Sequence, residues 1–330
     1  MDKRKLGGLS VGAIGLGCMG MSEFYGVRDD ETSLRVLEKA LEIGVTMLDT
    51  SDLYGDGHNE ELLGRFFKAS KGAREKVVLA TKFGIRRLPG VYSRKIDNSP
   101  EYIRSACEAS LKRLGVDAID LYYVHRIEQG RPIEETVGVL AELVKEGKIR
   151  AIGLSEPSAA TLEKACAAQT IAAVQSEYSL WTRGAEKDGV LKTCKARGVG
   201  FVAYSPLGRG FLTGTITDTS KLAPSDFRKM LPRFEKEKLG ENARRLKYVY
   251  DLARVHGATP AQIALSWVLS RPFGIVPIPG TKKLKYLEEN VASAKVVLTA
   301  AEIAGLEEAF PVGADYGERY TPEGMKSIGV

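Results

Sequence analysis

Short apolar runs rich in β-branched residues alternate with longer amphipathic segments along the whole chain. The apolar runs lie at AIGLG (13–17), VTMLD (45–49), VVLATK (77–82), IDLYYVH (119–125), RAIGLS (150–155), AAVQSE (172–177), GFVAYS (200–205) and GIVPIP (274–279). Runs of this length and composition are typical of strands that are buried on both faces. The pattern therefore predicts eight strands.

The segments between these runs place apolar residues at the three- and four-residue spacing of helices. Clear examples are residues 31–44, 59–70, 100–115 and 134–148. The third begins with Ser99-Pro100-Glu101, a typical helix start. Glycines that commonly terminate a helix follow three predicted helix ends, at Gly44, Gly115 and Gly198.

Buried strands that alternate with helices pair in parallel and are joined by right-handed crossovers. Eight such units predict an α/β fold, a closed (β/α)8 TIM barrel with an N-terminal β-hairpin, as a single domain over residues 1–330. A doubly wound open sheet is the alternative. Gly15, Gly17 and Gly20 match its dinucleotide-binding pattern by letter, but the following residues do not predict an immediate helix, so we favour the barrel.

Two segments interrupt the alternation of strands and helices. Residues 207–240 form a long insertion after the seventh predicted strand, and residues 311–330 form a Gly-rich C-terminal tail. Long connections in a compact domain are usually functional or mobile. We therefore expect both segments to contribute to a site.

Composition and charge narrow the classes of function. Hydrophobic residues make up 44% of the chain, and its net charge of +6 is spread over a mixed-sign sequence without the basic stripe of a nucleic-acid-binding protein. The four cysteines, Cys18, Cys107, Cys166 and Cys194, lie too far apart for a metal knuckle or a dense disulfide framework. No segment has the apolar length of a membrane span or a signal-peptide core. We expect a cytoplasmic protein with no metal, no nucleic-acid partner and no membrane association, and the oligomeric state stays open.

Ionisable residues end three successive predicted strands. Asp49, Lys82 and His125 take these positions, and Tyr54 follows in the loop after Asp49. The C-terminal ends of barrel strands form the active face, so these side chains are expected to meet there. A lysine ammonium stabilises a phenolate and lowers the pKa of a nearby tyrosine, which would make Tyr54 a proton donor to a carbonyl oxygen.

Several segments together resemble the aldo-keto reductase superfamily over almost the whole chain. They are LDTSDLYG (48–55), TKFG (81–84), YVHR (123–126), IGLSE (152–156), QSEYSL (175–180), YSPLGRGFLTG (204–214) and PIPGTKKLKYLEENV (277–291). The GLSE and EYSLWTR patterns are most similar to the bacterial and plant branch that includes perakine reductase and auxin-induced-protein-like reductases. The resemblance implies NADPH-dependent reduction of a small aldehyde or ketone, with Asp49, Tyr54, Lys82 and His125 as the catalytic tetrad.

The resemblance also implies where the cofactor binds. Tyr204 matches the aromatic residue that stacks on the nicotinamide, and Ser155 and Gln175 match its carboxamide partners. Glycines allow close backbone approach of the pyrophosphate to the loop after the seventh strand, at Ser205, Leu207, Gly208, Arg209 and Gly210. The loop after the eighth strand offers backbone donors, a hydroxyl and two ammonium groups to a 2′-phosphate, at Gly280, Thr281, Lys282 and Lys283. Glu289 and Asn290, further along the chain, match the family's adenine contacts. NADPH is therefore favoured over NADH.

The substrate pocket is predicted from residues near the strand ends: Met19, Phe24, Tyr25, Phe83, Arg126 and Trp181. Two positions depart from the wider family. Glu156 stands where many members have asparagine, and Tyr286 stands where many have an arginine that binds the 2′-phosphate. Both departures bear on the preference for NADPH over NADH and not on the identity of the cofactor as a nicotinamide dinucleotide.

Two other functions fit parts of the pattern. A regulatory subunit resembling channel β subunits would keep the barrel and the cofactor, but the intact tetrad disfavours it. A Schiff-base aldolase would use Lys82 as its nucleophile, because a fold alone does not fix the chemistry. The cofactor loops disfavour this second alternative, and the natural carbonyl substrate stays open.

Overall fold

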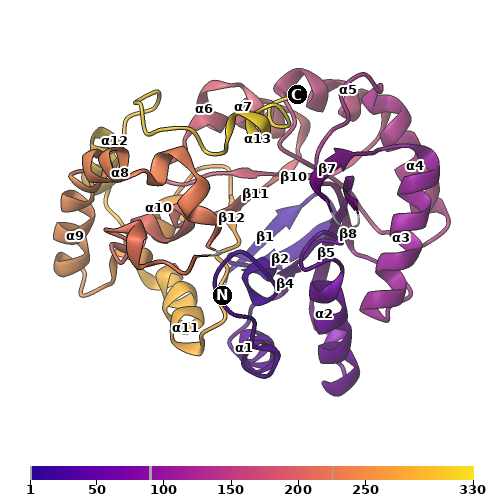
Figure 1. Cartoon of the computed structure of the whole chain (residues 1–330), viewed down its shortest axis with the longest axis horizontal. Helices are drawn as coiled ribbons and strands as arrows, with labels where there is room; N and C mark the ends of the chain where they lie inside the picture. Colours follow the sequence, from indigo (N-terminus) through magenta and orange to yellow (C-terminus); the bar gives the residue numbers. More distant parts are fainter. Residues whose placement is uncertain (1, 89–90, 225) are drawn as a thin grey trace.

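The computed structural model describes residues 2–88, 91–224 and 226–330 and contains a curved parallel sheet surrounded by helices (Figure 1). Its eight strands, in spatial order, are β3 (Leu16–Gly17), β4 (Met47–Asp49), β5 (Val78–Phe83), β8 (Leu121–Val124), β9 (Ile152–Ser155), β10 (Ile171–Glu177), β11 (Gly200–Tyr204) and β12 (Val276–Pro277). Each lies within one of the eight predicted runs or extends a run by one residue, so the predicted strands are confirmed.

The sheet closes where β3 meets the segment after β12. The Gly15 amide donates to the Pro277 carbonyl at 3.0 Å, and Gly17 forms a parallel bridge with Gly280. A Cβ atom on Gly17 would lie 2.8 Å from the carbonyl oxygen of Ile278, closer than a side chain can approach. These glycines therefore allow the seam of a (β/α)8 barrel to form, and the doubly wound alternative is excluded.

Helices follow the strands and cover the outside of the barrel. They are α1 (Asp30–Glu42), α2 (His58–Ala69), α3 (Pro100–Leu114), α4 (Ile133–Lys145), α5 (Ala159–Ala168), α6 (Gly184–Lys187), α7 (Val190–Arg197), α8 (Lys236–Ala243), α9 (Leu246–Val255), α10 (Pro260–Leu269), α11 (Leu284–Ala292), α12 (Ala300–Ala309) and α13 (Pro322–Met325). The Ser99 side chain caps α3, as predicted, and Gly115 and Gly198 end α3 and α7 in the left-handed conformation. Among the described residues, no helix is both long and apolar enough to cross a membrane.

Within the described residues, two antiparallel strand pairs lie outside the barrel sheet. The predicted N-terminal hairpin pairs β1 (Lys3–Leu6) with β2 (Leu9–Gly12), and its buried Leu6 and Val11 pack against residues of the barrel interior. The second pairs β6 (Ile85–Leu88) with β7 (Val91–Ile96), directly after β5. The second pair of strands could not be predicted from the sequence, because its arginines and lysine obscure any apolar alternation.

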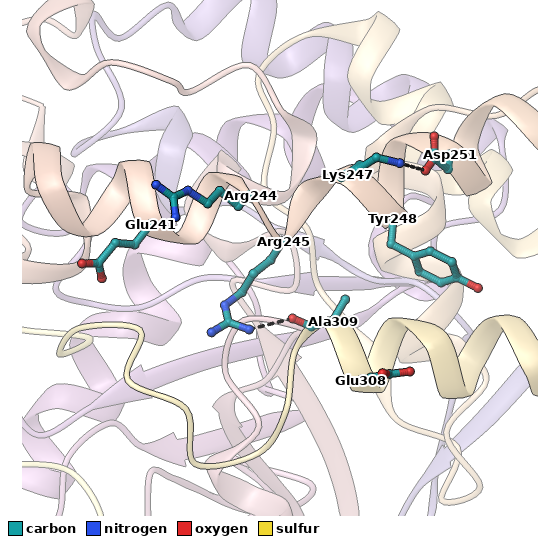
Figure 2. Close-up of a pocket in the computed structure, with 8 residues that line it drawn as sticks. All are labelled: Glu241, Arg244, Arg245, Lys247, Tyr248, Asp251, Glu308 and Ala309. Carbon is teal, nitrogen blue, oxygen red and sulfur yellow. Dashed lines mark hydrogen bonds and ion pairs between the residues drawn. The ribbon is translucent and has the colours of Figure 1, made fainter.

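The insertion after β11 forms a series of short helical turns. They are η3 (Gly208–Thr213), η4 (Thr219–Lys221), η5 (Phe227–Met230) and η6 (Pro232–Phe234), and α8 follows them. Between α8 and α9, the Arg245 guanidinium donates to the Ala309 carbonyl at the end of α12, at 3.0 Å (Figure 2). The chain after β11 is therefore packed against the outer helices.

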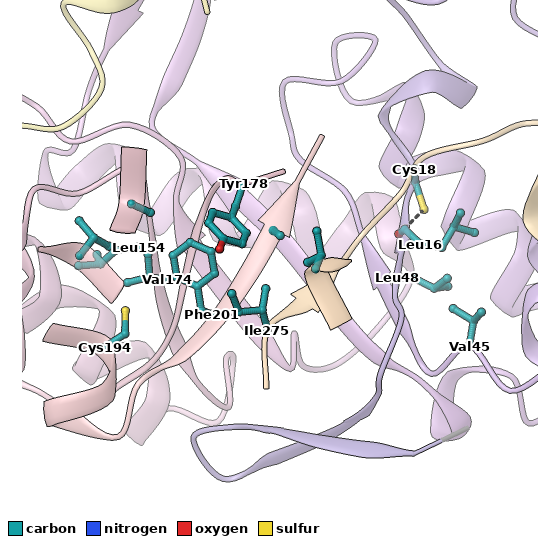
Figure 3. Packing of buried hydrophobic residues seen from close by; sticks show 14 of the residues in the cluster. Leu16, Cys18, Val45, Leu48, Leu154, Val174, Tyr178, Cys194, Phe201 and Ile275 are labelled. Carbon is teal, nitrogen blue, oxygen red and sulfur yellow. Dashed lines mark hydrogen bonds between the residues drawn. The ribbon is translucent and has the colours of Figure 1, made fainter. Parts of the chain in front are cut away.

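The buried apolar side chains of the barrel strands form two layers, one on each side of the barrel wall. Leu48, Leu154 and Phe201 belong to the larger layer between the strands and the helices (Figure 3). Met47 and Val202, their neighbours in sequence, belong to the smaller layer inside the barrel. The two layers follow from the two-residue period of a strand, which points successive side chains to opposite faces.

The C-terminal tail returns to the ends of the strands. Arg319 forms a bidentate ion pair with Glu156, with both N···O distances at 2.9 Å, and the Gly329 amide donates to the Glu156 carbonyl. Burial raises the pKa of the Glu156 carboxyl, but Arg319, together with Arg126 and the Glu177 amide, outweighs burial and lowers this pKa to about 2. The tail is therefore held by a charged pair in which the carboxylate is buried.

We predict that Gly17→Ala destabilises the barrel, because the new methyl group would meet a backbone oxygen that cannot rotate away. The free energy of unfolding should fall by about 1–3 kcal/mol, measured by urea denaturation. Gly138→Ala in α4 is the matched control, since nothing lies within 4 Å of its added Cβ. Equal stability of the two variants would contradict the role of Gly17 in closure.

We also predict that Arg319→Ala lowers the free energy of unfolding by about 3 kcal/mol, because it leaves the buried Glu156 carboxylate without its main partner. Lys326→Ala, which breaks the exposed Lys326–Glu323 pair, should change it by less than about 1 kcal/mol. Chemical denaturation of both variants measures the difference. A loss no larger for Arg319→Ala than for Lys326→Ala would show that the tail is held by other contacts.

Candidate active site

Three of the predicted tetrad residues are hydrogen-bonded to one another at the C-terminal end of the barrel. The Lys82 ammonium donates to Asp49 Oδ1 at 2.5 Å, to the Thr50 carbonyl at 2.8 Å and to the Tyr54 hydroxyl at 3.2 Å. Lys82 is fully buried, so its charge needs these partners. All three N–H groups of the ammonium are therefore used.

Asp49 is held by a second strand partner. Its Oδ2 atom accepts a hydrogen bond from Gln175 Nε2 at 2.7 Å. Gln175 pairs in register with Ser155 on the neighbouring strand β9. The carboxylate therefore joins β4 to β5 through Lys82 and to β10 through Gln175, across the barrel interior.

The electrostatics of this group correct one expectation. Burial raises the pKa of Tyr54, and the Lys82 ammonium lowers it by less, so in the chain alone this pKa lies above its ordinary value. Burial lowers the pKa of Lys82, but Asp49 and Tyr54 outweigh burial and raise it. Lys82 therefore lowers the pKa of Tyr54 as predicted, but the prediction left out burial, which raises this pKa by more.

His125 completes the group from the end of β8. Its ring lies nearly perpendicular to the Tyr54 ring, at an interplanar angle of 87° with the ring centroids 5.9 Å apart. Its Nδ1 atom lies 3.1 Å from the Ser51 hydroxyl. The structure therefore brings all four predicted tetrad residues to one end of the barrel.

Four of the predicted pocket residues lie near this group or near the insertion. Met19 packs against the cluster that contains Tyr54. Arg126 donates to the Ser155 hydroxyl at 3.2 Å and to the His125 carbonyl. Phe24 lies 5.3 Å from Phe227 of η5 between ring centroids, and the Arg228 guanidinium lies over the Tyr25 ring.

The prediction that Phe83 and Trp181 line the pocket is wrong. Phe83 stacks on Tyr122 in the layer between the strands and the helices, because it follows the inward-pointing Lys82 along β5. Trp181 is fully buried and stacks on Phe211 at 4.1 Å between ring centroids, under the insertion. Both side chains serve packing.

The loop after β11 has the backbone expected of a phosphate-binding turn. Ser205, Gly208, Arg209 and Gly210 all have positive φ angles. The Arg209 guanidinium, however, is buried and turned toward Glu177, whose Oε2 atom it approaches at 2.9 Å and whose carboxylate it shares with Arg233. The backbone of this loop, which includes Leu207, is therefore better placed than the Arg209 side chain to contact a phosphate.

The Tyr204 side chain is held in place by its hydroxyl group. This hydroxyl donates to Glu156 Oε1 at 2.7 Å and lies 3.0 Å from the Tyr320 hydroxyl. The roles of Tyr320 and Arg319 could not be predicted from the sequence, because no pattern links the Gly-rich tail to β9 and β11. The glutamate at position 156, where many family members have asparagine, could have indicated such a partner, since a buried carboxylate needs a cation nearby.

The loop after β12 leads into α11. Lys282 donates to the Tyr25 and Val27 carbonyls at 2.7 and 2.6 Å, whereas Lys283 is exposed immediately before the helix. The Thr281 hydroxyl accepts from the Lys283 amide, and Gly280 lies against Gly17. Further along, Glu289 accepts from the Thr259 hydroxyl and Asn290 is buried.

Two hollows on the outer surface contain none of the four predicted tetrad residues. One of about 560 Å³ lies between α8, α9 and α12, where Lys247 pairs with Asp251 (Figure 2). A larger one of about 1240 Å³ lies beside α2 and α3, and Arg65 and Arg113 on its wall are already paired with carboxylates. The end of the barrel that holds Tyr54 is therefore the better candidate site.

Comparisons with known proteins agree with this geometry. Residues 13–310 match the model of the Aldo/keto reductase family. The chain is 44% identical over 321 residues to the aldo-keto reductase yakc [NADP(+)] of Schizosaccharomyces pombe, covering 97% of this chain and 94% of the relative.

Two solved structures share the fold. The thermostable aldo-keto reductase Tm1743, in complex with the inhibitor epalrestat, is 31% identical with a TM-score of 0.73, and the match covers 94% of this chain and all of that one. The glycerol dehydrogenase AKR11B4 of Gluconobacter oxydans is 28% identical with a TM-score of 0.83, covering 93% of this chain and 94% of that one. The chain belongs to the aldo/keto reductase family.

Proposed function

We propose that the chain is an NADP-dependent oxidoreductase that reduces aldehydes and ketones to alcohols, with Tyr54 as the proton donor. The observation that supports this most strongly is the contact of the Lys82 ammonium with both Asp49 and the Tyr54 hydroxyl, at 2.5 and 3.2 Å. Family membership and the NADP(+) in the name of the yeast relative support the cofactor.

Each residue has a separate role in this proposal. NADPH, when bound, supplies the hydride that reaches the carbonyl carbon. Tyr54 donates its proton to the carbonyl oxygen, and the Lys82 ammonium stabilises the phenolate that remains. Asp49 keeps Lys82 charged and oriented, and His125 donates a hydrogen bond to the substrate oxygen. The carbonyl thus gains one hydride and one proton and becomes an alcohol.

The loops at this end of the barrel have the chemistry to hold NADPH. The positive-φ turn at Ser205 and Gly208–Gly210 and the amides before α11 suit phosphate groups. We assign Ser155 and Gln175 to the carboxamide, Tyr204 to the nicotinamide ring, and Glu289 and Asn290 to the adenine. Lys282 and Lys283 then read the 2′-phosphate.

The same features bear on finer points of identity. We place the chain in the branch with perakine reductase on its GLSE and EYSLWTR segments, whose Glu156 and Glu177 both have arginine partners.

The four cysteines are free, which supports a reducing, cytoplasmic location. Lys82 is unsuited to a Schiff-base role, because Asp49 helps to raise its pKa and keeps the amine protonated.

Tyr54→Phe should lower kcat for carbonyl reduction by about 10²–10⁴-fold, because only the proton donor is removed. The Kd of NADPH, followed by fluorescence titration, should change little. Tyr250→Phe, a change of the same type at an exposed residue of α9, is the control. Turnover by Tyr54→Phe that equals the control would reject this tyrosine as the acid.

Lys283→Ala and Lys282→Ala should each raise the Kd of NADPH by about tenfold and leave the Kd of NADH nearly unchanged, since a charged hydrogen bond to the 2′-phosphate contributes about 1.5 kcal/mol. Lys285→Ala, at an exposed lysine in the first turn of the helix that follows them, α11, is the control. Equal weakening of both cofactors would mean that these lysines do not recognise the 2′-phosphate.

A further inference from the structure

The Ser51 hydroxyl lies between His125 and a carboxyl group that the proposed reaction does not use. Its Oγ atom lies 3.1 Å from His125 Nδ1 and 3.2 Å from Asp52 Oδ1, and 3.4 Å from the Lys82 carbonyl. The Leu53 amide donates to the same Oγ atom at 3.2 Å. Ser51 is fully buried, so these contacts are not diluted by exchange with solvent.

Ser51 has one hydroxyl hydrogen and several acceptors within reach. An ionised Asp52 is the strongest of these acceptors, because hydrogen bonds to a charged group are about twice as strong as neutral ones. Ser51 then donates to Asp52, and His125 must carry a proton on Nδ1 to bond with the Ser51 oxygen. If Asp52 is protonated, Ser51 is free to donate to Nδ1, and a neutral His125 carries its proton on Nε2.

We propose that Asp52, acting through Ser51, determines which ring nitrogen of His125 carries the proton, so that Asp52 and Ser51 are positioning residues for the carbonyl-reducing site. This inference rests on the proposed function of His125. The Nε2–H form can donate to a carbonyl oxygen, as reduction requires. The Nδ1–H form presents an Nε2 lone pair, which suits the acceptance of a proton from an alcohol.

The surroundings of Asp52 place its ionisation in the physiological range. Burial and the nearby Glu60 on α2 raise the pKa of Asp52 to about 7, while Ser51 and Arg113 on α3 oppose them. The Tyr102 phenol on α3 and the Tyr122 phenol on β8 both lie near enough to respond to the charge of Asp52. His125 itself faces Tyr54.

The sign of the pH dependence follows from this arrangement. Below about pH 7, Asp52 is protonated and the neutral His125 ring takes the Nε2–H form that favours carbonyl reduction. As the pH rises through this value, the carboxylate forms, Ser51 turns toward it, and His125 takes the Nδ1–H form. The kcat/KM of reduction should therefore fall through the same pH range, by about tenfold for a group that orients its neighbour.

Ring-nitrogen NMR tests the relay without relying on turnover. The chain has three histidines, His58, His125 and His256, so ¹⁵N-histidine labelling of the full chain gives a spectrum that single His→Gln variants can assign. Spectra of the protein with and without NADP+ are recorded from about pH 5.5 to 8.5. In the wild type, the His125 signals should change from the Nε2–H to the Nδ1–H pattern near neutral pH.

Two variants interrupt the relay at different points. Asp52→Asn removes the ionisation, so the tautomer change of His125 and the matching step in the pH profile of kcat/KM should both disappear. Ser51→Ala removes the connection, so His125 should no longer respond to Asp52, and kcat should fall more than KM changes. Asp30→Asn is the matched control, because Asp30 bonds to His58 Nε2 at 3.1 Å and its loss should alter only the His58 signals.

The result that would overturn the proposal is a His125 tautomer change that persists unaltered in Asp52→Asn or in Ser51→Ala. Circular dichroism confirms that each variant is folded, and either variant alone is sufficient to decide. Loss of turnover in Tyr54→Phe together with an unaltered His125 response would leave the proposed reaction intact and reject only the relay.

Discussion

The buried ion pair between Lys82 and Asp49 is the constraint on which the candidate site depends. Removing two charges from water is unfavourable unless every remaining hydrogen-bonding group finds a partner. Here the ammonium uses the Asp49 carboxylate, the Thr50 carbonyl and the Tyr54 hydroxyl, and the second carboxylate oxygen uses Gln175. The Tyr54 phenol that we propose as the acid is thus one of the groups that offset the cost of burying the Lys82 charge. The hydrogen bond that it makes for this purpose also fixes its position.

The position of a residue in the fold could be predicted from the sequence where it follows directly from the order of the strands. The proximity of Asp49, Lys82 and His125 could be predicted because they lie at or next to the ends of successive strands, and parallel strands bring those ends together. Prediction from the sequence failed where the direction of a side chain depends on packing. Trp181 reads as a loop residue but is buried under the insertion, and the Arg209 side chain turns inward to Glu177.

The second kind of failure concerns partners that are far apart in sequence. Glu156 departs from the pattern of many family members, and the sequence alone could mark it only as a source of uncertainty. In the structure, Arg319 from the tail pairs with it, and the Tyr204 hydroxyl bonds to the same carboxylate. No periodicity in a Gly-rich segment could have indicated this contact, because it depends on how the tail crosses the end of the barrel.

The opposite orientations of Lys82 and Phe83 have a consequence for how this chain tolerates change in length. The ammonium faces the barrel interior and the phenyl ring faces the helices, and only the two-residue period of β5 separates them. Loss or gain of one residue upstream within β5 would exchange their faces, placing a ring among the polar groups and a charge among leucines. Chain-length variation among relatives should therefore be confined to the connecting loops and absent from this strand.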